Sequence, residues 1–284
     1  MSAHVSEQDI IKYYDTCESD YRLLWHLSEQ QAMHYGYWTE ETGLLRDALK
    51  NMNAFVLSKL IVKSGDRILD AGCGVGGSVL YAAQHWNCEA WGITLSDKQC
   101  KKAEQNANER SLLGKAHFAV QNYCHTNFEN DSFHGVYGIE SICHANSKAE
   151  FLREAYRLLK PGGRLVVADF FRTAKSKNHQ KEYLMEKWAQ TWAIPDFSYW
   201  HLFLEEASNV GLELTGNFDI SRNIYKSARR LYYYFYPGLV CHFVLRLFGL
   251  RTKVQGKNMW STFYQYKSLK EGLWEYRVLQ FEKK

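Results

Sequence analysis

The pattern of apolar and polar positions divides the chain into regions of different type. In residues 7–60 apolar positions recur at helical spacing, most clearly at Leu45, Leu49, Met52 and Val56. Short apolar runs then alternate with amphipathic segments. Strands are predicted at 67–70, 90–94, 116–120, 134–139 and 164–168, and helices at 78–85, 97–109 and 148–159. Strands that alternate with helices predict an α/β fold, in which a doubly wound parallel sheet carries helices on both faces.

The alternation of strands and helices stops after Asp169. Residues 173–209 and 221–270 have the spacing of aromatic-rich helices, and the alternating apolar positions of 272–281 predict a final strand. We therefore expect an α/β core with a helical insertion before its last strand. The expected divisions are an N-terminal helical segment over 1–60, the core over 61–172, a helical cap or substrate region over 173–270, and the last strand over 271–284.

Composition and charge exclude several classes of protein. The 284 residues are 46% hydrophobic and 23% charged, which is ordinary for a globular protein and excludes disordered, collagen-like and coiled-coil chains. The net charge of +4 is too small, and too evenly spread, for a nucleic-acid binder. Aromatic residues are in excess at 15%, which indicates a large apolar pocket, a cation-binding pocket or a surface that faces a membrane.

The cysteines and the apolar stretches bear on the compartment. Seven cysteines at wide spacings, with no C-x-x-C, indicate reduced thiols in a cytoplasmic protein and no metal site. The first ten residues contain no apolar run, so no secretory signal is predicted. The apolar stretch 231–245 is shorter than the ~20 residues that a spanning helix needs. Residues 227–250 are basic at both ends, so we expect either the lid of a pocket or peripheral contact with a membrane.

A glycine-rich loop joins the first predicted strand to the following helix. Residues 70–77 read D-A-G-C-G-V-G-G, and such glycines permit a tight turn and let a ligand approach the backbone. The Lys-Ser/Thr of a phosphate-binding loop is absent, and the dinucleotide pattern G-x-G-x-x-G is imperfect. Asp70 would repel a pyrophosphate but would hold a positively charged amino group. The loop therefore favours a cofactor that contains an amino-acid part.

This loop resembles the first motif of the class I S-adenosylmethionine (SAM)-dependent methyltransferases, hydrophobic-x-Asp-x-Gly-x-Gly-x-Gly. The resemblance covers residues 60–170 and implies a seven-stranded, mostly parallel, Rossmann-like sheet. In that family the loop wraps the methionine part of SAM. The cofactor-binding residues that the resemblance implies are Asp70, Gly72, Cys73, Gly74, Gly76, Gly77, Thr94, Leu95, Ser96, Gln99, Asn122, Tyr123 and Glu140.

Two stretches of this core depart from the usual family pattern. Most class I enzymes bind the ribose through an acid after the second strand, where this chain has Thr94 and Ser96, whose hydroxyls donate and accept hydrogen bonds. The usual Asp beside the adenine is replaced by Asn122, which can still pair with the adenine edge. The string G-I-T-L-S-x-x-Q over 92–99 is similar to that of tocopherol-type methyltransferases.

A candidate acid/base pair follows the fourth predicted strand. Residues 138–145, G-I-E-S-I-C-H-A, resemble the I-E-x-x-x-H-A string of sterol C-methyltransferases and their small-molecule relatives. Methylation of an alkene or aromatic carbon creates a cation and then requires loss of a proton. Glu140 would stabilise that cation and His144 would remove the proton, directly or through water. With a phenol or an amine, the pair would deprotonate the nucleophile. Purely structural roles for both residues are the alternative.

The N-terminal segment adds aromatic candidates. Its Tyr13-Tyr14-Asp15 and His34–Trp38 strings look like the Y-Y-D … H-x-G-Y/W segment that closes over the cofactor in these enzymes. Tyr14 would hold the sulfonium by cation–π attraction, whereas the alternative is a helix that packs aromatic rings on the core. The aromatic cap indicates an apolar acceptor, although such rings also serve as plain core. The predicted substrate-pocket residues are Tyr35, Trp38, Trp188, Trp192 and Tyr199.

Together these patterns predict a SAM-dependent methyltransferase that acts on a lipophilic small molecule. C-methylation of a sterol, isoprenoid or prenylated phenol is the main interpretation. N- or O-methylation of an amine, phenol or natural product is the first alternative, and a catalytically inactive SAM-binding or membrane-associated protein is the second. A nucleic-acid methyltransferase is disfavoured, because no Asn/Asp-Pro-Pro-Tyr string follows the fourth predicted strand. Oligomeric state is left open.

Overall fold

A single seven-stranded sheet forms the centre of the computed structural model, which describes residues 5–25 and 31–284. The strand order is β3-β2-β1-β4-β5-β7-β6, and only β7 runs antiparallel to its neighbours β5 and β6. This arrangement confirms the predicted seven-stranded, mostly parallel sheet. The strands are β1 Arg67–Ala71, β2 Glu89–Thr94, β3 Ala116–Val120, β4 Phe133–Ile139, β5 Leu159–Arg172, β6 Leu212–Asp219 and β7 Trp274–Lys283.

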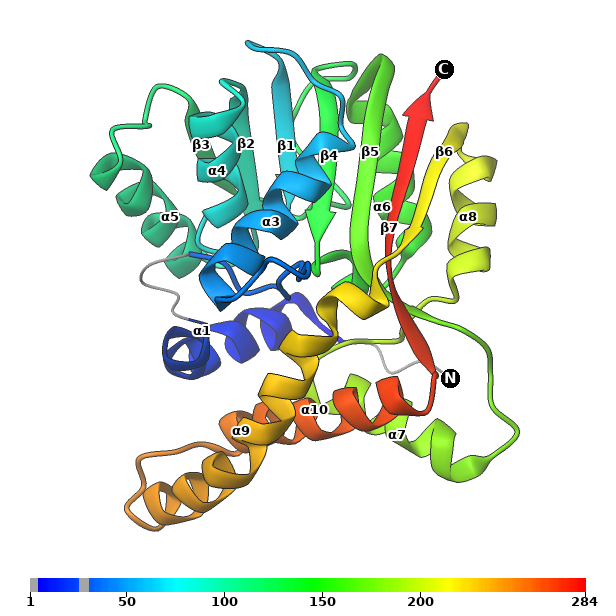
Figure 1. Ribbon diagram of the computed structural model, residues 1–284. Helices are drawn as coiled ribbons and strands as arrows, with labels where there is room; N and C mark the ends of the chain where they lie inside the picture. The colour runs from blue at the N-terminus through cyan, green and yellow to red at the C-terminus, as the bar shows by residue number, and fades with distance from the viewer. Residues whose placement is uncertain (1–4, 26–30) are drawn as a thin grey trace.

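Helices cover the two faces of the sheet and its carboxyl-terminal edge (Figure 1). Helices α3 and α4 pack together on one face, and α6 packs with α8 on the other. Helices α1, α7, α9 and α10 lie across the end of the sheet where the parallel strands finish. The helices are α1 Glu7–Leu24, α3 Leu45–Ser58, α4 Gly77–His85, α5 Asp97–Glu109, η1 Ile142–His144, α6 Lys148–Leu158, α7 His179–Thr191, α8 Trp200–Asn209, α9 Ser221–Leu247 and α10 Lys253–Lys270.

Both faces of the central strands are buried, which explains their continuous apolar runs. Successive side chains of a strand point to opposite faces. Ile68 of β1 packs in the core beneath α3 and α4, whereas its neighbour Leu69 packs in the core beneath α6 and α8. Val166 and Val167 of β5 divide in the same way. The sheet is therefore a rigid platform whose carboxyl-terminal edge lies beneath α1.

The interval 173–270, expected as a helical cap, also contains two elements of the core. Helix α8 packs on α6 as part of the core, and β6 is the edge strand of the sheet. Only Leu212 of β6 is buried, so the strand lacks the strong apolar signal of the central strands. Its weaker signal is the alternation of Leu212, Leu214 and Phe218 with polar residues, which fits an edge strand.

Helix α9 is the longest helix described, with 27 residues and Pro237 inside it. Its side chains are a mixture of aromatic, apolar and basic groups. Within residues 5–25 and 31–284, no helix is both long and apolar enough to cross a membrane.

Candidate active site

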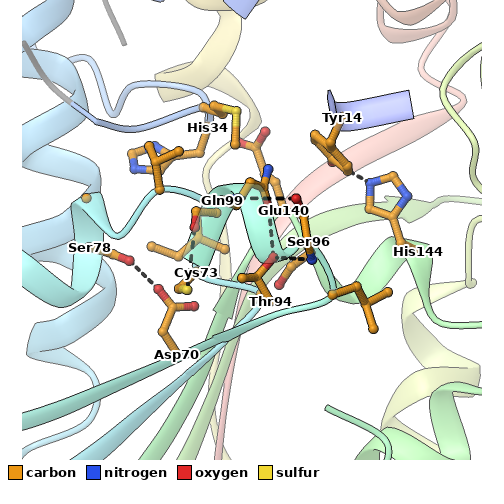
Figure 2. Close-up of a pocket in the computed structure, with 18 of the residues that line it drawn as sticks. Tyr14, His34, Asp70, Cys73, Ser78, Thr94, Ser96, Gln99, Glu140 and His144 are labelled. Atoms are coloured by element: carbon orange, nitrogen blue, oxygen red, sulfur yellow. Dashed lines mark hydrogen bonds between the residues drawn. The ribbon is translucent and has the colours of Figure 1, made fainter. Parts of the chain in front are cut away.

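The candidate active site is a cavity at the carboxyl ends of β1, β2 and β4, closed on one side by α1 (Figure 2). We call it the loop cavity, because the glycine loop after β1 forms one wall. Most of the predicted cofactor and catalytic residues meet here. The predicted residues that line it are Tyr14, Asp70, Gly72, Cys73, Gly74, Gly77, Thr94, Leu95, Ser96, Gln99, Tyr123, Glu140, His144 and Trp192.

The glycine loop needs its glycines for two physical reasons. Gly72, Gly74 and Gly76 have φ values of 108°, 53° and 90°, a left-handed region that side chains with a Cβ rarely adopt. A Cβ on Gly72 would also lie 2.4 Å from the Cβ of Ser141. A Cβ on Gly74 would lie 2.8 Å from the Cε of Met33, which also lines the cavity. The loop is thus a glycine cradle that can turn tightly and lie close to Ser141 and Met33 only because it lacks side chains at these positions.

Asp70 is the penultimate residue of β1 and lines the loop cavity. Its side chain accepts a hydrogen bond from the Ser78 hydroxyl at the start of α4. Burial raises the pKa of Asp70 to about 7, while hydrogen bonds with Ser78 and Tyr137 act in the opposite direction. A cationic group in the cavity would favour the ionised carboxylate, because opposite charges attract strongly when they are shielded from water. This environment fits the amino group of the methionine part of SAM.

The hydroxyl groups after β2 line the cavity and also fasten α1 to the core. The Thr94 hydroxyl donates to Gln99 Oε1 at 2.7 Å. Ser96 accepts from the backbone N–H of Gln99 at 3.2 Å as the N-cap of α5, and its hydroxyl donates to Asp15 of α1 at 2.7 Å. The two hydroxyls that the sequence predicts as ribose contacts therefore lie at the junction of α5 and α1.

Two predicted cofactor residues, Gly76 and Asn122, do not line the loop cavity. Gly76 faces Phe118, whose Cζ would lie 2.8 Å from an added Cβ. The Asn122 amide donates to Glu7 of α1 at 2.7 Å, and its oxygen accepts from the backbone N–H of Cys124 at 2.7 Å. Asn122 thus ties the start of α1 to the loop after β3, and its neighbour Tyr123 contributes to the cavity wall.

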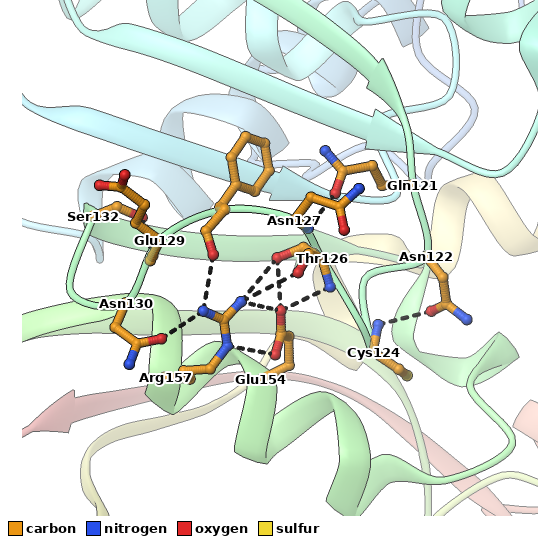
Figure 3. Close-up of polar contacts among 11 residues, drawn as sticks. Gln121, Asn122, Cys124, Thr126, Asn127, Glu129, Asn130, Ser132, Glu154 and Arg157 are labelled. Atoms are coloured by element: carbon orange, nitrogen blue, oxygen red, sulfur yellow. Dashed lines mark hydrogen bonds and ion pairs between the residues drawn. The ribbon is translucent and has the colours of Figure 1, made fainter.

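The loop between β3 and β4 is held by a partly buried ion pair (Figure 3). Arg157 of α6 pairs with Glu154 at 2.6 Å and donates to the Phe128 carbonyl oxygen at 2.8 Å. Glu154 in turn accepts from the backbone N–H of Thr126 at 2.8 Å. These bonds fix the backbone that follows Tyr123, so this wall of the cavity is preorganised.

Glu140 follows β4 with a φ of 54°, which is strained for a residue with a side chain. Its Oε1 accepts from the backbone N–H of Tyr35 at 2.7 Å and from the Tyr276 hydroxyl at 2.9 Å. Burial raises its pKa to about 8; the two hydrogen bonds oppose that rise, and the nearby Asp169 carboxylate adds to it. Strain and hydrogen bonds therefore hold one buried carboxyl in a fixed position.

His144 and Tyr14 form a hydrogen-bonded pair in the loop cavity. The Nδ1 of His144 lies 3.0 Å from the carbonyl oxygen of Ala193, which can only accept a hydrogen bond, so we assign the proton to Nδ1. Burial lowers the pKa of His144 to about 4, so the ring is neutral near pH 7. Its Nε2 therefore accepts from the Tyr14 hydroxyl, 2.7 Å away. The Glu140 carboxyl has different partners, so the two predicted acid/base groups act from separate positions.

A second cavity adjoins the first and runs between α1 and the pair α9 and α10. We call it the hairpin cavity, because α9 and α10 are consecutive helices that pack together as a hairpin. Its walls include Leu231 and Phe235 of α9, together with Met259 of α10. Four residues line both cavities, and these mark where the two meet: Tyr21, Met33, Glu140 and Trp192. The buried carboxyl of Glu140 thus lies where a ligand in one cavity faces a ligand in the other.

The predicted substrate aromatics divide into two groups. Tyr35 lines the hairpin cavity, and Trp192 lines both cavities. The other three lie away from both. Trp38 donates from Nε1 to the Ser227 hydroxyl at 2.8 Å, and Trp188 is fully buried with its ring 4.2 Å from that of Phe197. Tyr199 packs beneath Arg172, whose guanidinium carbon lies 5.2 Å from the ring centroid.

The predicted site residues do not include Tyr21, Met33 and Tyr276, among others. Tyr21 lies seven positions after Tyr14, two turns along the same face of α1, and their rings stack with centroids 6.0 Å apart. That spacing was a usable signal. Tyr276 reaches Glu140 from β7, a contact across 136 positions of sequence that no local pattern encodes.

Within residues 5–25 and 31–284, no group of three or more His, Cys, Asp or Glu side chains is placed to hold a metal ion.

Comparison with known proteins gives the family. Residues 2–227 match the family model described as mycolic acid cyclopropane synthetase. The 24-methylenesterol C-methyltransferase 2 of Arabidopsis thaliana is 30% identical over 178 residues, which are 62% of this chain and 49% of that protein. The 27-O-demethylrifamycin SV methyltransferase of Amycolatopsis mediterranei is 30% identical over 162 residues, 57% of this chain and 58% of that protein. This chain therefore spans about half the length of these curated relatives.

Among solved structures, the cyclopropane synthase MmaA2 from Mycobacterium tuberculosis has the same fold. The TM-score is 0.83 at 19% sequence identity, over 100% of this chain and 99% of that one. The family model covers most of the chain, including the glycine loop, Glu140 and His144. The chain belongs to the mycolic acid cyclopropane synthetase family, and its fold is the Rossmann-like fold of the class I methyltransferases.

Proposed function

We propose that this chain is a SAM-dependent methyltransferase that methylates a carbon atom of a lipophilic acceptor, namely a sterol, an isoprenoid or a prenylated phenol. The observation that carries this proposal is the junction of the two cavities at Glu140. The loop cavity fits the cofactor, and the hairpin cavity fits an apolar acceptor. Family membership and the sterol C-methyltransferase relative support the same chemistry.

The loop cavity supplies the groups that SAM requires. The glycine cradle would accept the methionine part, with Asp70 facing its amino group, and Thr94 and Ser96 offer hydroxyls to the ribose. Bound SAM supplies a methyl group on a positively charged sulfonium, ready for attack by a nucleophilic carbon. The protein supplies position and electrostatics rather than a reactive group of its own.

Glu140 is the residue that we propose stabilises positive charge during transfer. Methylation of an alkene leaves a cation on the acceptor. The sulfonium of bound SAM and this cation would lower the pKa of Glu140 from about 8 and favour its ionised form. The carboxylate would then stabilise the positive charge. Its two hydrogen bonds fix the carboxylate before the reaction begins. The rings of Tyr21 and Trp192, which line both cavities, add cation–π attraction and exclude water.

Tyr14 and His144 are the groups that we propose remove the final proton. The Tyr14 hydroxyl donates to the neutral Nε2 of His144. The acceptor's C–H bond breaks, its proton passes to the Tyr14 oxygen, and the proton of Tyr14 passes to His144. The electron pair of the broken C–H bond forms the new alkene and neutralises the cation. This relay keeps proton transfer inside the protein.

Methylation of oxygen or nitrogen is the alternative that a specific observation favours. The Amycolatopsis relative is named as a methyltransferase of 27-O-demethylrifamycin SV. The same Tyr14–His144 pair would deprotonate a phenol or an amine. A catalytically inactive SAM-binding protein is the second alternative. It would bind SAM without turning it over.

We also propose a cytoplasmic location with peripheral membrane contact through residues 227–250. The lid and membrane interpretations apply to different side chains of this segment. Leu231 and Phe235 line the hairpin cavity, whereas Phe243 and Leu247 are exposed by 60% and 86%. One helix therefore serves as a cavity wall and also presents an outward apolar face.

The proposed function is tested by release of S-adenosylhomocysteine (SAH) from SAM. The purified chain is incubated with SAM and, separately, with sterols, linear isoprenoids, prenylated phenols and small amines. SAH release above the acceptor-free level with one of the first three classes supports the proposal. Release only with amines supports the alternative, and SAM binding without release with any class supports an inactive protein. Absence of SAM binding overturns the cofactor assignment.

A further inference from the structure

We propose that helices α9 and α10 dock on an anionic phospholipid bilayer and that the hairpin cavity receives its acceptor from that surface. We call these two helices, residues 221–270, the hairpin. The inference rests on the proposed function for the identity of the acceptor. The docking surface itself depends on charge, exposure and geometry that the catalytic chemistry does not use.

The positive charge of the chain is concentrated in the hairpin. The whole chain has 35 Lys and Arg against 31 Asp and Glu, and residues 221–270 hold ten of the basic residues and none of the acidic ones. The rest of the chain therefore carries 35 − 10 = 25 basic and 31 acidic residues, a net charge of −6. The ten basic residues are Arg222, Lys226, Arg229, Arg230, Arg246, Arg251, Lys253, Lys257, Lys267 and Lys270. An anionic surface would attract the hairpin and repel the body.

The tip of the hairpin exposes apolar side chains to water. Leu247 and Phe248 are exposed by 86% and 74%, Leu250 by 69%, and Val240 by 65%. Figure 1 shows this tip extending away from the sheet and its covering helices. Several large apolar side chains exposed together at one end of a protein mark a site of interaction with another apolar phase.

The tip is a defined turn that presents these side chains from a fixed unit. Gly249 has a φ of 70°, and its N–H donates to the Arg246 carbonyl at 3.0 Å, which ends α9. Thr252 and Gln255 form a capping box that begins α10. The two helices also approach closely, since a Cβ on Gly256 would lie 2.8 Å from Nε2 of His242. The apolar tip therefore enters a surface as one rigid element.

Basic and apolar residues are arranged as an interfacial element requires. Arg246 precedes the exposed Leu247 and Phe248, and Lys253 and Lys257 follow them in the first turns of α10. A helix that lies in a bilayer interface places its apolar side chains at the boundary of the acyl chains and its basic side chains at the level of the headgroups. Within the described residues no helix qualifies to cross the bilayer, so contact of this kind is peripheral.

The hairpin cavity connects this surface with the catalytic junction. Tyr234, Cys241 and Leu245 of the outer part of α9 line the cavity, whose far end is formed by Glu140 and Trp192. An apolar acceptor that leaves the bilayer would thus move along an apolar wall instead of crossing water. This continuity favours a lipid surface over other occupants. If the hairpin of a second copy docked on this one, ten positive charges would face ten others. An acidic protein would match the charge but not the apolar tip.

Co-sedimentation with lipid vesicles tests the docking surface. One set of vesicles is phosphatidylcholine alone, and the other is two parts phosphatidylcholine to one part phosphatidylglycerol. We expect the chain to bind the mixed vesicles at least about tenfold more tightly, and we expect added salt to weaken that binding. Equal affinity for both sets overturns the anionic preference. Absence of binding to either set overturns the docking proposal.

Two sets of substitutions separate the apolar and the charged contributions. The triple variant Val244→Glu, Leu247→Glu and Phe248→Glu replaces three exposed apolar side chains of the tip by charged ones. The pair Lys253→Glu and Lys257→Glu reverses the flanking charge. Each is expected to weaken binding to mixed vesicles by at least about tenfold. Unchanged vesicle binding by both variants overturns the assignment of the surface.

Matched controls come from exposed positions outside the hairpin. Leu113→Glu, at a position 53% exposed, and Lys50→Glu on α3 are expected to bind vesicles like the parent chain. SAH binding by calorimetry, which the hairpin variants should retain, shows that the core is folded. Vesicle binding without SAH binding would refute the proposed function and leave the docking surface standing. If sedimentation velocity shows a dimer that the triple variant abolishes, the tip is a contact between copies and the proposal is wrong.

Discussion

Replacement of Glu140 by glutamine removes an ionisable group from the junction of the cavities while it preserves the local hydrogen bonds. Both bonds to the side chain, from the Tyr35 N–H and from the Tyr276 hydroxyl, are accepted by Oε1, and the glutamine carbonyl oxygen can accept both. The substitution therefore isolates the effect of ionisation. Its consequence for stability follows from the pKa of the buried carboxyl.

The pKa of Glu140 is raised by burial from an ordinary value of 4.5 to about 8. The folded chain holds this proton up to about pH 8, whereas the unfolded chain loses it near 4.5, so the stability that the group contributes at low pH is lost as the pH rises through this window. The difference between the two pKa values corresponds to roughly 5 kcal/mol at about 1.4 kcal/mol per pKa unit. Between about pH 5 and about pH 9, roughly 4 kcal/mol of this is lost.

Urea unfolding of the parent chain and of Glu140→Gln across this pH range measures the effect. We expect the free energy of unfolding of the variant, relative to the parent, to rise by roughly 4 kcal/mol from about pH 5 to about pH 9. Glu186→Gln, which changes an exposed glutamate of α7, is the matched control and should leave the pH dependence unchanged. A constant difference between Glu140→Gln and the parent would show that the carboxyl is not held in a buried site.

Three further predictions concern the cofactor and the proton relay. Tyr14→Phe removes the hydroxyl that donates to His144, so turnover should fall at least about tenfold with little change in SAH affinity. Turnover equal to that of the parent chain, measured as SAH release, would exclude the relay. Gly74→Val places a side chain on a backbone with a φ of 53°, so calorimetry should show SAM binding abolished, and parent-like affinity would refute the cradle. Ser96→Ala breaks the bond to Asp15, so the SAM dissociation constant should increase about fivefold; no increase would show that α1 closes without this bond.

The arrangement of the core was largely predictable from the sequence because both faces of its strands are buried. Continuous apolar runs place β1 and β2 within one residue of their observed bounds, whereas β5 begins five residues earlier and ends four residues later than the predicted 164–168. β6 was not predictable in the same way, because a strand at the edge of the sheet buries only Leu212. Local patterns thus report burial, and they fail where an element stays half-exposed.

The candidate site was predictable where one continuous stretch of sequence builds it. Residues of the glycine loop line the cavity because adjacent positions and positive φ values are enough to make the turn. Aromatic residues were less informative. Trp188 and Trp192 lie one helical turn apart, yet Trp188 is packed in the core and Trp192 faces both cavities. Only tertiary packing decides which ring of an aromatic helix faces a cavity.

The central claim is that a methyl group passes from SAM to a carbon of an apolar acceptor at the junction beside Glu140. Product mass spectrometry tests it most directly. The chain is incubated with methyl-deuterated SAM and a pooled panel of sterols, linear isoprenoids, prenylated phenols and small amines. We predict that one apolar compound gains a trideuteromethyl group in place of hydrogen, and that its fragments place the label on carbon. A label on oxygen or nitrogen, or an unlabelled panel in the presence of bound SAM, would contradict the claim.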